Sequence, residues 1–173
     1  VYINNSFAGQ CPYGYSNFYV DITKFVSFQE KNSIKVVVKN GVPSGRWYTG
    51  GGIYRDVNIM VADRLHIAPD GVQLAAIEIE EEQAVIRASA QVEYTGYGVR
   101  DISLKTEIYD ADDKLVASDM MPITITATAG NTYMPKLYVK NPTLWDVDCP
   151  YIYKYKTSLC DGDTLIDEEV GSL

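Results

Sequence analysis

Histidine is nearly missing from this sequence, in which His66 is the only one among 173 residues. A single imidazole excludes a metal site built on several histidines, and it argues against a catalytic triad that depends on histidine. We therefore expect His66 to be a partly buried structural residue near a domain junction.

Cysteine is also scarce, and the three present, Cys11, Cys149 and Cys160, lack the Cys-x-x-Cys spacing of zinc sites. An extended strand between Cys149 and Cys160 would separate them by roughly 33 Å, whereas a disulfide needs Cα atoms within about 7 Å. Unless that strand bends back, we expect free thiols that are buried or half-buried. Neither the single histidine nor the three cysteines indicate a metal site or a cofactor.

Positive charge is in deficit, because 15 Lys and Arg residues face 23 Asp and Glu residues and the net charge is −8. Nucleic-acid-binding domains usually carry a basic stripe, so we expect no nucleic-acid partner. No apolar run approaches 18 residues, so we expect no transmembrane helix and no membrane partner. We interpret Glu80 to Glu82 as a charged turn, since neighbours on a strand point to opposite faces and form no catalytic pair.

A helical period of 3.6 residues is missing as well, apart from one helical turn expected at 22–25 after Asp21. Apolar and polar residues instead alternate with a period of two, which predicts β-strands. The alternating runs lie at 34–38, 57–61, 86–93, 102–108, 123–126 and 151–156. Turn pairs such as Asp70-Gly71 separate them, and this spacing is typical of antiparallel sandwiches. The sequence therefore predicts an all-β protein.

We place a domain boundary at residues 63 and 64. Residues 64–173 have the length of one immunoglobulin-like sandwich of seven or eight strands. Residues 1–63 hold about five expected strands, which is half of a two-sheet sandwich and leaves an apolar face uncovered. We therefore expect a preceding half-domain, or a second copy in a homo-oligomer, to cover that face.

Residues 46–57 narrow the function most, and they read Arg-Trp-Tyr-Thr-Gly-Gly-Gly-Ile-Tyr-Arg-Asp-Val. The glycines Gly50, Gly51 and Gly52 permit close approach of another group. Aromatic rings that stack and guanidinium groups that donate hydrogen bonds, carried on a glycine loop, favour binding of a sugar. Phosphate is disfavoured, because no Lys-Ser/Thr pair follows the glycines and no helix starts there.

Two interpretations of this stretch remain open. Arg46, Trp47 and Tyr48 are candidates for the rim of a sugar site, whereas Gly50–Gly52, Tyr54, Arg55 and Asp56 form a motif that we interpret as structural. In that role Tyr54 packs in a core or against another domain, and Arg55 pairs with a carboxylate, either that of Asp56 or one on another domain. Elsewhere, we interpret Tyr13 and Tyr15 as core residues or interdomain contacts, with the core preferred, and we expect Trp145 to plug one end of the second sandwich.

Five stretches resemble, in order, motifs of glycoside hydrolase family 2, the family of β-galactosidases, β-glucuronidases and β-mannosidases. They are Val1–Asn4 ("VYVNG"), Pro12–Asp21 ("PYGYxxFxxD"), Asn32–Val38 ("NxIxVxV"), Arg46–Val57 ("RWYSGxGIYRDV") and Asn141–Tyr153 ("NPxLWxxxxPYLY"). The resemblance implies that residues 1–63 are the C-terminal part of a sugar-binding, galactose-binding-like jelly roll. It also implies that residues 64–173 are the immunoglobulin-like domain that follows.

The resemblance further implies where catalysis takes place. Retaining glycosidases need two carboxylates about 5 Å apart, and in this family both are glutamates on a (β/α)₈ barrel that follows the immunoglobulin-like domain. This sequence contains no such barrel, so we assign no catalytic residue to it. Some members carry an acidic residue near the position of Arg46 that helps to bind sugar or a cation. Arg46 departs from that pattern, so we expect no metal there.

We therefore expect a non-catalytic fragment of a retaining glycoside hydrolase, most like a β-galactosidase that hydrolyses terminal β-glycosidic bonds. The intact enzyme would bind a carbohydrate substrate, and the fragment alone would be inactive. The alternatives are a free-standing carbohydrate-binding module and a structural β-sandwich fragment without a ligand. The sequence leaves the compartment open, with a periplasmic or secreted location preferred to a cytoplasmic one.

Overall fold

The computed structural model describes residues 1–40, 51–127 and 130–173. In these ranges every regular element is a β-strand, which confirms the all-β prediction. The chain divides into two compact units, Val1–Ile59 and Met60–Leu173. The expected turn of helix is also present, as the N–H groups of Phe25 and Val26 both donate to the carbonyl of Ile22.

The first unit contains one small antiparallel sheet. Its strands are β1 (Tyr2–Ile3), β2 (Ser6–Phe7) and β3 (Ile34–Lys35), in the order β2-β1-β3. Asn4 and Asn5 join β1 to β2 with φ angles of 48° and 68°, the left-handed pair that a two-residue hairpin turn requires. The described part of this unit thus has three short strands where we expected about five.

An amide network holds the first unit together. The side chain of Asn4 donates to the carbonyl of Phe25 at 3.0 Å and to Oδ1 of Asn32 at 2.8 Å, and it accepts from the N–H of Ser33 at 2.9 Å. Asn32 in turn accepts from the N–H of Ser27 at 2.8 Å. In this unit, side-chain hydrogen bonds therefore connect segments that an apolar core would otherwise hold together.

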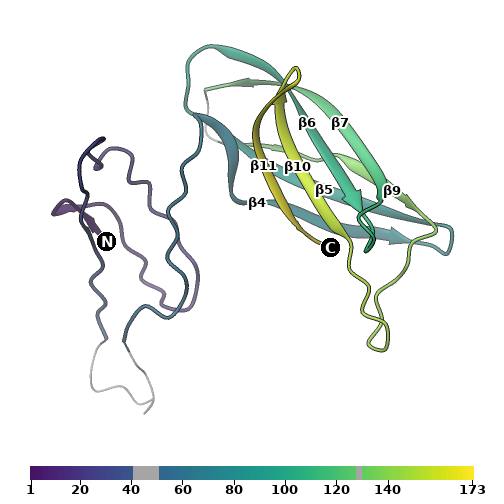
Figure 1. Cartoon of the computed structure of the whole chain (residues 1–173), viewed down its shortest axis with the longest axis horizontal. Coiled ribbons are helices and arrows are strands. Elements are labelled where there is room, and N and C mark those ends of the chain that lie inside the picture. The colour runs from purple at the N-terminus through teal and green to yellow at the C-terminus, as the bar shows by residue number, and fades with distance from the viewer. Residues whose placement is uncertain (41–50, 128–129) are drawn as a thin grey trace. The chain divides into compact units, whose positions relative to one another are not determined.

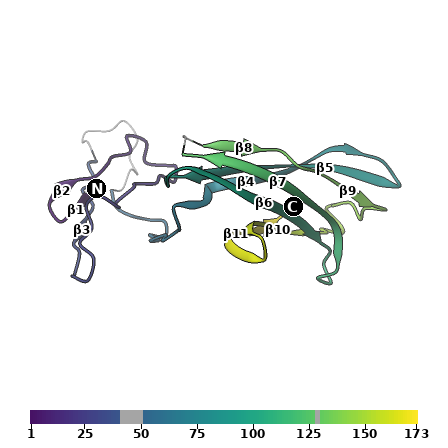
Figure 2. The same ribbon diagram turned by 90° about the horizontal axis from the view of Figure 1, so that it is seen from above.

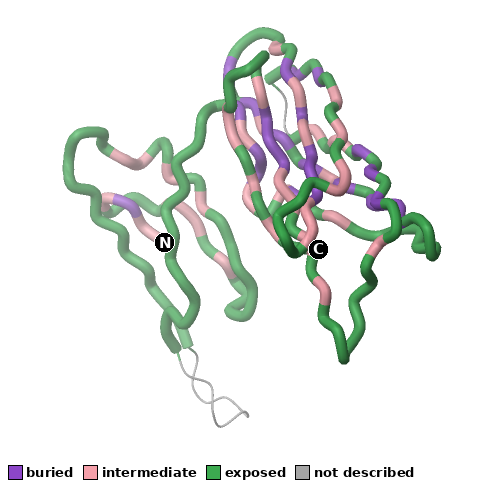
Figure 3. Tube along the Cα trace, turned by 45° about the vertical axis from the view of Figure 1, so that its right-hand side comes forward, coloured by how far each residue is buried: buried purple, intermediate pink, exposed green. Residues whose placement is uncertain are grey.

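Apolar side chains of the first unit are mostly in contact with water. Ile3 is its only buried hydrophobic residue among those described, and Figure 3 shows the tube of this unit as mostly exposed, with some segments of intermediate exposure. The run at 57–61, which crosses from the first unit into the second and which we expected to be a strand, is not one, and Val57, Ile59 and Val61 are exposed. A strand needs a hydrogen-bonded neighbour, and the described part of this unit offers none to that run. Most described apolar side chains of this unit are thus left uncovered by the chain itself, and the partner that we expect to cover them stays a prediction.

The second unit is a sandwich of two antiparallel sheets. One sheet has the order β11-β10-β6-β7, and the other has the order β4-β5-β8 with β9 also paired to β5 (Figures 1 and 2). The strands are β4 (Leu65–Ile79), β5 (Gln83–Tyr94), β6 (Val99–Tyr109), β7 (Leu115–Thr126), β8 (Asn131–Tyr133), β9 (Lys136–Lys140), β10 (Lys154–Asp161) and β11 (Thr164–Ser172). This is the expected immunoglobulin-like arrangement.

Alternation along these strands places one set of side chains between the sheets. The larger buried cluster is Leu65, Ile67, Val72, Ala90, Val92, Tyr94, Ile102, Leu104, Ile123, Ile125 and Leu159. A second cluster is Ala84, Ile86, Ala88, Ile108, Leu137 and Val139. Figure 3 shows that the buried segments concentrate in this unit, so the apolar contribution to folding comes mainly from here.

Strand β4 is interrupted near its start. Its pairing with β5 shifts between Ile67 and Val72, and Asp70 has a φ of 53°. A Cβ on Gly71 would lie 2.5 Å from the carbonyl oxygen of Ala68, so this position accepts only glycine without a backbone shift. Such an interruption leaves backbone amides that the ladder does not use.

Two carboxylates of β11 accept hydrogen bonds from backbone amides at this interruption. Oδ2 of Asp167 accepts from the N–H of Ile67 at 2.8 Å, and the carboxylate of Glu169 accepts from the N–H of Val72. Burial, with the neighbouring charges of Asp70 and Asp167, raises the pKa of Glu169, and the Val72 N–H opposes that rise. The contacts join the edge strands of the two sheets.

The outer face of β6 and β10 carries an ion-pair cluster. Glu107 Oε1 lies 2.7 Å from Nζ of Lys105, and its Oε2 lies 3.5 Å from Nζ of Lys156. Burial disfavours the charged carboxylate, but the two ammonium groups outweigh it and hold the pKa of Glu107 below its usual value. Glu107 is thus a buried carboxylate whose charge is paired with two ammonium groups.

Candidate functional site

The glycine-rich stretch is described only in part. Arg46, Trp47, Tyr48 and Gly50, which we predicted from sequence, lie outside the described residues. Gly52 has a φ of 153°, which side-chain-bearing residues rarely adopt. A Cβ on Gly51 would lie 3.1 Å from Cβ of Asn40, so Gly51 lies close to Asn40. The backbone here thus uses the freedom that the glycines supply.

Tyr54 and Arg55 fasten this stretch to the segment around Gly14. The hydroxyl of Tyr54 donates to the carbonyl of Gly14 at 3.1 Å. Arg55 donates through Nη1 to Oδ1 of Asn17 at 2.7 Å and through Nη2 to the carbonyl of Tyr15 at 3.0 Å. The guanidinium carbon also lies 5.4 Å from the centre of the Tyr54 ring. Two sequence motifs that are about 40 residues apart are joined here.

Several of the predicted environments differ from those observed. Within this chain the oxygens that accept from Arg55 are neutral, an amide and a carbonyl, and a carboxylate partner on another domain stays a prediction. Nothing in the sequence around Asn17 marked it as that partner. Tyr54 and Asp56 are exposed in this chain, so Tyr54 is not in a core of the first unit, and its packing against another domain stays a prediction. Tyr54 is instead held by its hydroxyl, a contact that needs no buried ring.

Tyr13 and Tyr15 are not core residues either, although we expected them to be. Both rings are exposed, and they contact each other with ring centres 5.7 Å apart. Because the first unit has no second sheet in its described part, no core exists for them to enter. Their exposure makes this motif a surface of aromatic rings and backbone carbonyls fixed by Arg55.

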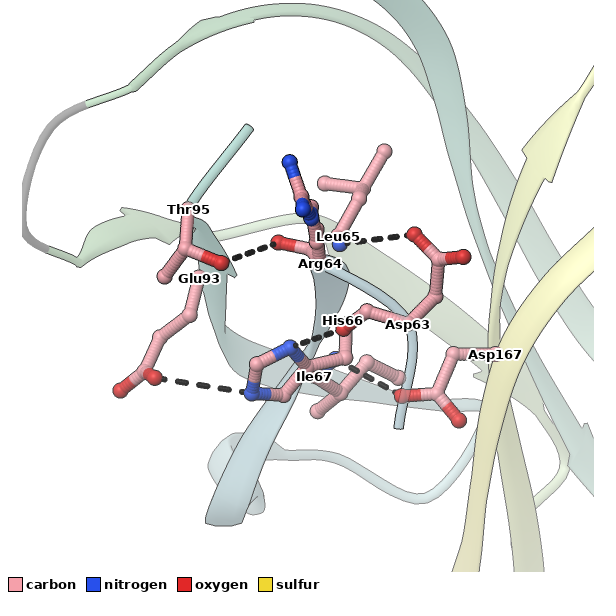
Figure 4. Close-up of polar contacts among 8 residues, drawn as sticks. All are labelled: Asp63, Arg64, Leu65, His66, Ile67, Glu93, Thr95 and Asp167. Carbon is pink, nitrogen blue, oxygen red and sulfur yellow. Dashed lines mark hydrogen bonds and ion pairs between the residues drawn. The ribbon is translucent and has the colours of Figure 1, made fainter. Parts of the chain in front are cut away.

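A second polar cluster lies where the sandwich begins (Figure 4). Nδ1 of His66 is 2.8 Å from the carbonyl oxygen of Asp63, and its Nε2 is 3.5 Å from Oε2 of Glu93. Asp63 also accepts from the N–H of Leu65 at 3.2 Å, and the carbonyl of Arg64 accepts from the N–H of Thr95 at 2.8 Å. These bonds fix the first residues of β4, so His66 has the structural role that we predicted.

The acidic run at 80–82 and the three cysteines are the remaining groups that the sequence analysis considered. No group of three or more His, Cys, Asp or Glu residues in the described ranges is placed to hold a metal ion. Glu80 to Glu82 form the turn between β4 and β5, closed by the N–H of Glu80 donating to the carbonyl of Gln83 at 2.8 Å. Cys11, Cys149 and Cys160 are free thiols, as expected, although Cys149 is exposed and not buried or half-buried. No described helix is long and apolar enough to span a membrane.

Comparison with known proteins decides the family. Residues 66–172 match the model of glycosyl hydrolases family 2. The chain belongs to this family. A β-galactosidase of Bacteroides ovatus is 30% identical over 168 residues, which are 96% of this chain and 20% of that protein. A β-glucuronidase of Formosa agariphila is 29% identical over 188 residues, covering 96% of this chain and 19% of that protein.

Solved structures of family 2 proteins match the chain along nearly its whole length. A family 2 member from Bacteroides cellulosilyticus has a TM-score of 0.90 at 28% identity, covering 99% of this chain and 24% of that one. A β-glucuronidase from Bacteroides uniformis has a TM-score of 0.88 at 27% identity, covering 99% of this chain and 22% of that one. The family 2 chain described here thus spans about a fifth of the length of the relatives that it matches.

Proposed function

We propose that this chain is a non-catalytic part of a retaining family 2 glycoside hydrolase that cleaves terminal β-glycosidic bonds. The main support is the structural match to a family 2 protein, which covers 99% of this chain and 24% of that protein. Relatives named as a β-galactosidase and a β-glucuronidase support two substrate classes. We propose β-galactosides as the first and β-glucuronides as the second.

Catalysis in this proposal belongs to a domain outside this chain. The family resemblance puts both catalytic glutamates on a (β/α)₈ barrel that follows the immunoglobulin-like domain. The acidic run most suggestive of a pair, Glu80 to Glu82, is an exposed turn. The proposed partners of the chain are accordingly the barrel and the N-terminal half of the jelly roll, with the carbohydrate bound by the assembled enzyme. The exposed apolar residues of the first unit support the second of these partners.

The glycine-rich stretch has two proposed roles within that enzyme. Arg46, Trp47 and Tyr48 line the rim of the substrate site, and the residues from Gly50 onward anchor them. The bonds from Tyr54 and Arg55 to Gly14, Tyr15 and Asn17 support the anchoring role, because they fix the end of the loop to another segment.

The first test compares this chain with the intact protein. Purified residues 1–173 should hydrolyse no aryl β-galactoside, β-glucuronide or β-mannoside above the buffer rate, because retaining chemistry needs two positioned carboxylates. The intact protein should hydrolyse at least one of them. Turnover by the chain that persists through repurification would contradict the assignment of catalysis to the barrel. Tight sugar binding by the chain alone would favour a free-standing carbohydrate-binding module.

Trp47→Ala in the intact enzyme tests the rim. A stacking contact or a charge-assisted hydrogen bond is worth about 1–3 kcal/mol, which corresponds to a loss of roughly 5- to 150-fold in kcat/KM. The melting temperature should move by only a few degrees. A core role gives the opposite result, a stability loss of about 3–5 kcal/mol with near-normal kinetics in the folded fraction. Both quantities should be measured on the same preparation.

A further inference from the structure

The connection between β9 and β10 is an ordered loop that leaves the sandwich, residues 141–153, here called the 141–153 loop (Figure 1). Its tip is closed by two reciprocal backbone bonds of 3.1 Å between Asp146 and Cys149. Oδ1 of Asp146 also accepts from the N–H of Asp148 at 3.0 Å. The loop therefore has a defined turn and is not a random connection.

Hydrogen bonds also fix the base of the loop. The hydroxyl of Tyr153 accepts from the N–H of Thr143 at 2.8 Å, and the hydroxyl of Tyr151 accepts from the N–H of Ala111 at 3.2 Å. The rings of Tyr151 and Tyr153 contact each other edge to face, with centres 5.0 Å apart. On the other side, the N–H of Asn141 donates to the carbonyl of Glu82 at 2.7 Å.

This fixed loop presents apolar side chains to solvent. Trp145 is 62% exposed and Val147 is 80% exposed, and Leu144 is exposed as well. We expected from the sequence that Trp145 would plug the end of the sandwich, and this prediction is wrong. The loop extends away from the sheets, so the ring of Trp145 has no core to enter. Several exposed apolar side chains, one of them a tryptophan, grouped on one ordered loop are typical of an interaction site.

The last residue of the chain lies beside this loop. The N–H of Leu173 donates to the carbonyl of Tyr153 at 2.8 Å, and the N–H of Tyr153 donates to the carbonyl of Leu173 at 2.8 Å. In a longer protein, the polypeptide that follows Leu173 would start at the base of the 141–153 loop. Asp146 and Asp148 add negative charge next to the apolar residues.

We propose that the 141–153 loop is the contact through which this sandwich docks onto the domain that follows Leu173. This inference rests on the proposed function, in which a catalytic domain follows the immunoglobulin-like domain. Trp145 would enter an apolar recess of that domain, with Leu144 and Val147 around it. Asp146 and Asp148 select a recess bordered by lysine or arginine. The short path from Leu173 to the loop favours this occupant over a second copy of the chain.

The experiment compares Trp145 in residues 1–173 with Trp145 in the intact protein. Hydroxyl-radical oxidation of Trp145, read by mass spectrometry, should be at least about fivefold lower in the intact protein, because docking buries an interface anchor. Trp145→Ala should lower the melting temperature of the intact protein by several degrees. The same change should leave residues 1–173 nearly unaffected, because the ring is exposed there.

Tyr97→Ala supplies the matched control, since Tyr97 is exposed in the turn at the opposite end of β6 and should change neither protein. Equal oxidation of Trp145 in both proteins would overturn the proposal. Protection that appears only when sugar is added would also overturn it, in favour of a sugar-binding role for the loop. An intact protein that protects Trp145 but hydrolyses no glycoside supports the docking and rejects only the proposed function.

Discussion

Leu159→Ala is expected to lower the free energy of unfolding of the second unit by about 2–5 kcal/mol. Leu159 has no exposed surface, and it belongs to the larger buried cluster between the two sheets. Its strand β10 is a central strand, paired to β6 on one side and to β11 on the other. Neighbouring strands therefore cannot easily shift to fill the space that the lost side chain leaves.

The measurement is urea denaturation followed by circular dichroism, with Leu165→Ala as the matched control. Leu165 lies in the adjacent strand β11, opposite Cys160, and it is 52% exposed. The control should cost less than about 1 kcal/mol. Equal losses for the two variants would mean that β10 does not sit in the core as described.

Thr106→Val and Thr157→Val are each expected to destabilise the sandwich by about 1–3 kcal/mol, and the double variant should be close to wild type. The two hydroxyl groups lie 3.3 Å apart on the paired strands β6 and β10, and both residues have 0% exposure. A single substitution leaves the other hydroxyl buried without this partner. Replacing both removes the pair with little change of shape.

A double-mutant cycle measures this coupling. The expected interaction energy is at least about 1 kcal/mol, with the double variant more stable than the sum of the single effects implies. The Ser118→Ala change on β7, on the outward side opposite Glu107, provides a control that should add independently to either threonine variant. Strict additivity of the two threonine changes would contradict the hydroxyl pair.

The fold was largely predictable because strand alternation is a local property. Ile102, Leu104 and Ile108 alternate with polar residues in the sequence, and all three are buried in the sandwich. The same reasoning failed at 57–61, where the alternation is equally clear and no strand forms in the described structure. Alternation shows which face of a strand is apolar, but a strand also needs a neighbour to accept its hydrogen bonds.

The candidate site was predictable only as a motif. The sequence indicated Tyr54 and Arg55 as structural residues, but it gave no sign that Asn17 and the carbonyl of Tyr15 accept from Arg55. A hydrogen bond between residues about 40 positions apart depends on how two loops approach each other, and a local sequence pattern does not predict that approach. The rim residues Arg46, Trp47 and Tyr48 stay predictions.

By itself, the sequence determined the β-strands, their inward faces and the family motifs, because the period of two and the turn residues act within a few positions. The tertiary structure alone decided that Thr106 meets Thr157, that Asp167 and Glu169 bond to the bulge of β4, and that Trp145 faces solvent. Each of these depends on strand register or loop direction between distant segments. Those are set when the two sheets pack together and not by neighbouring residues.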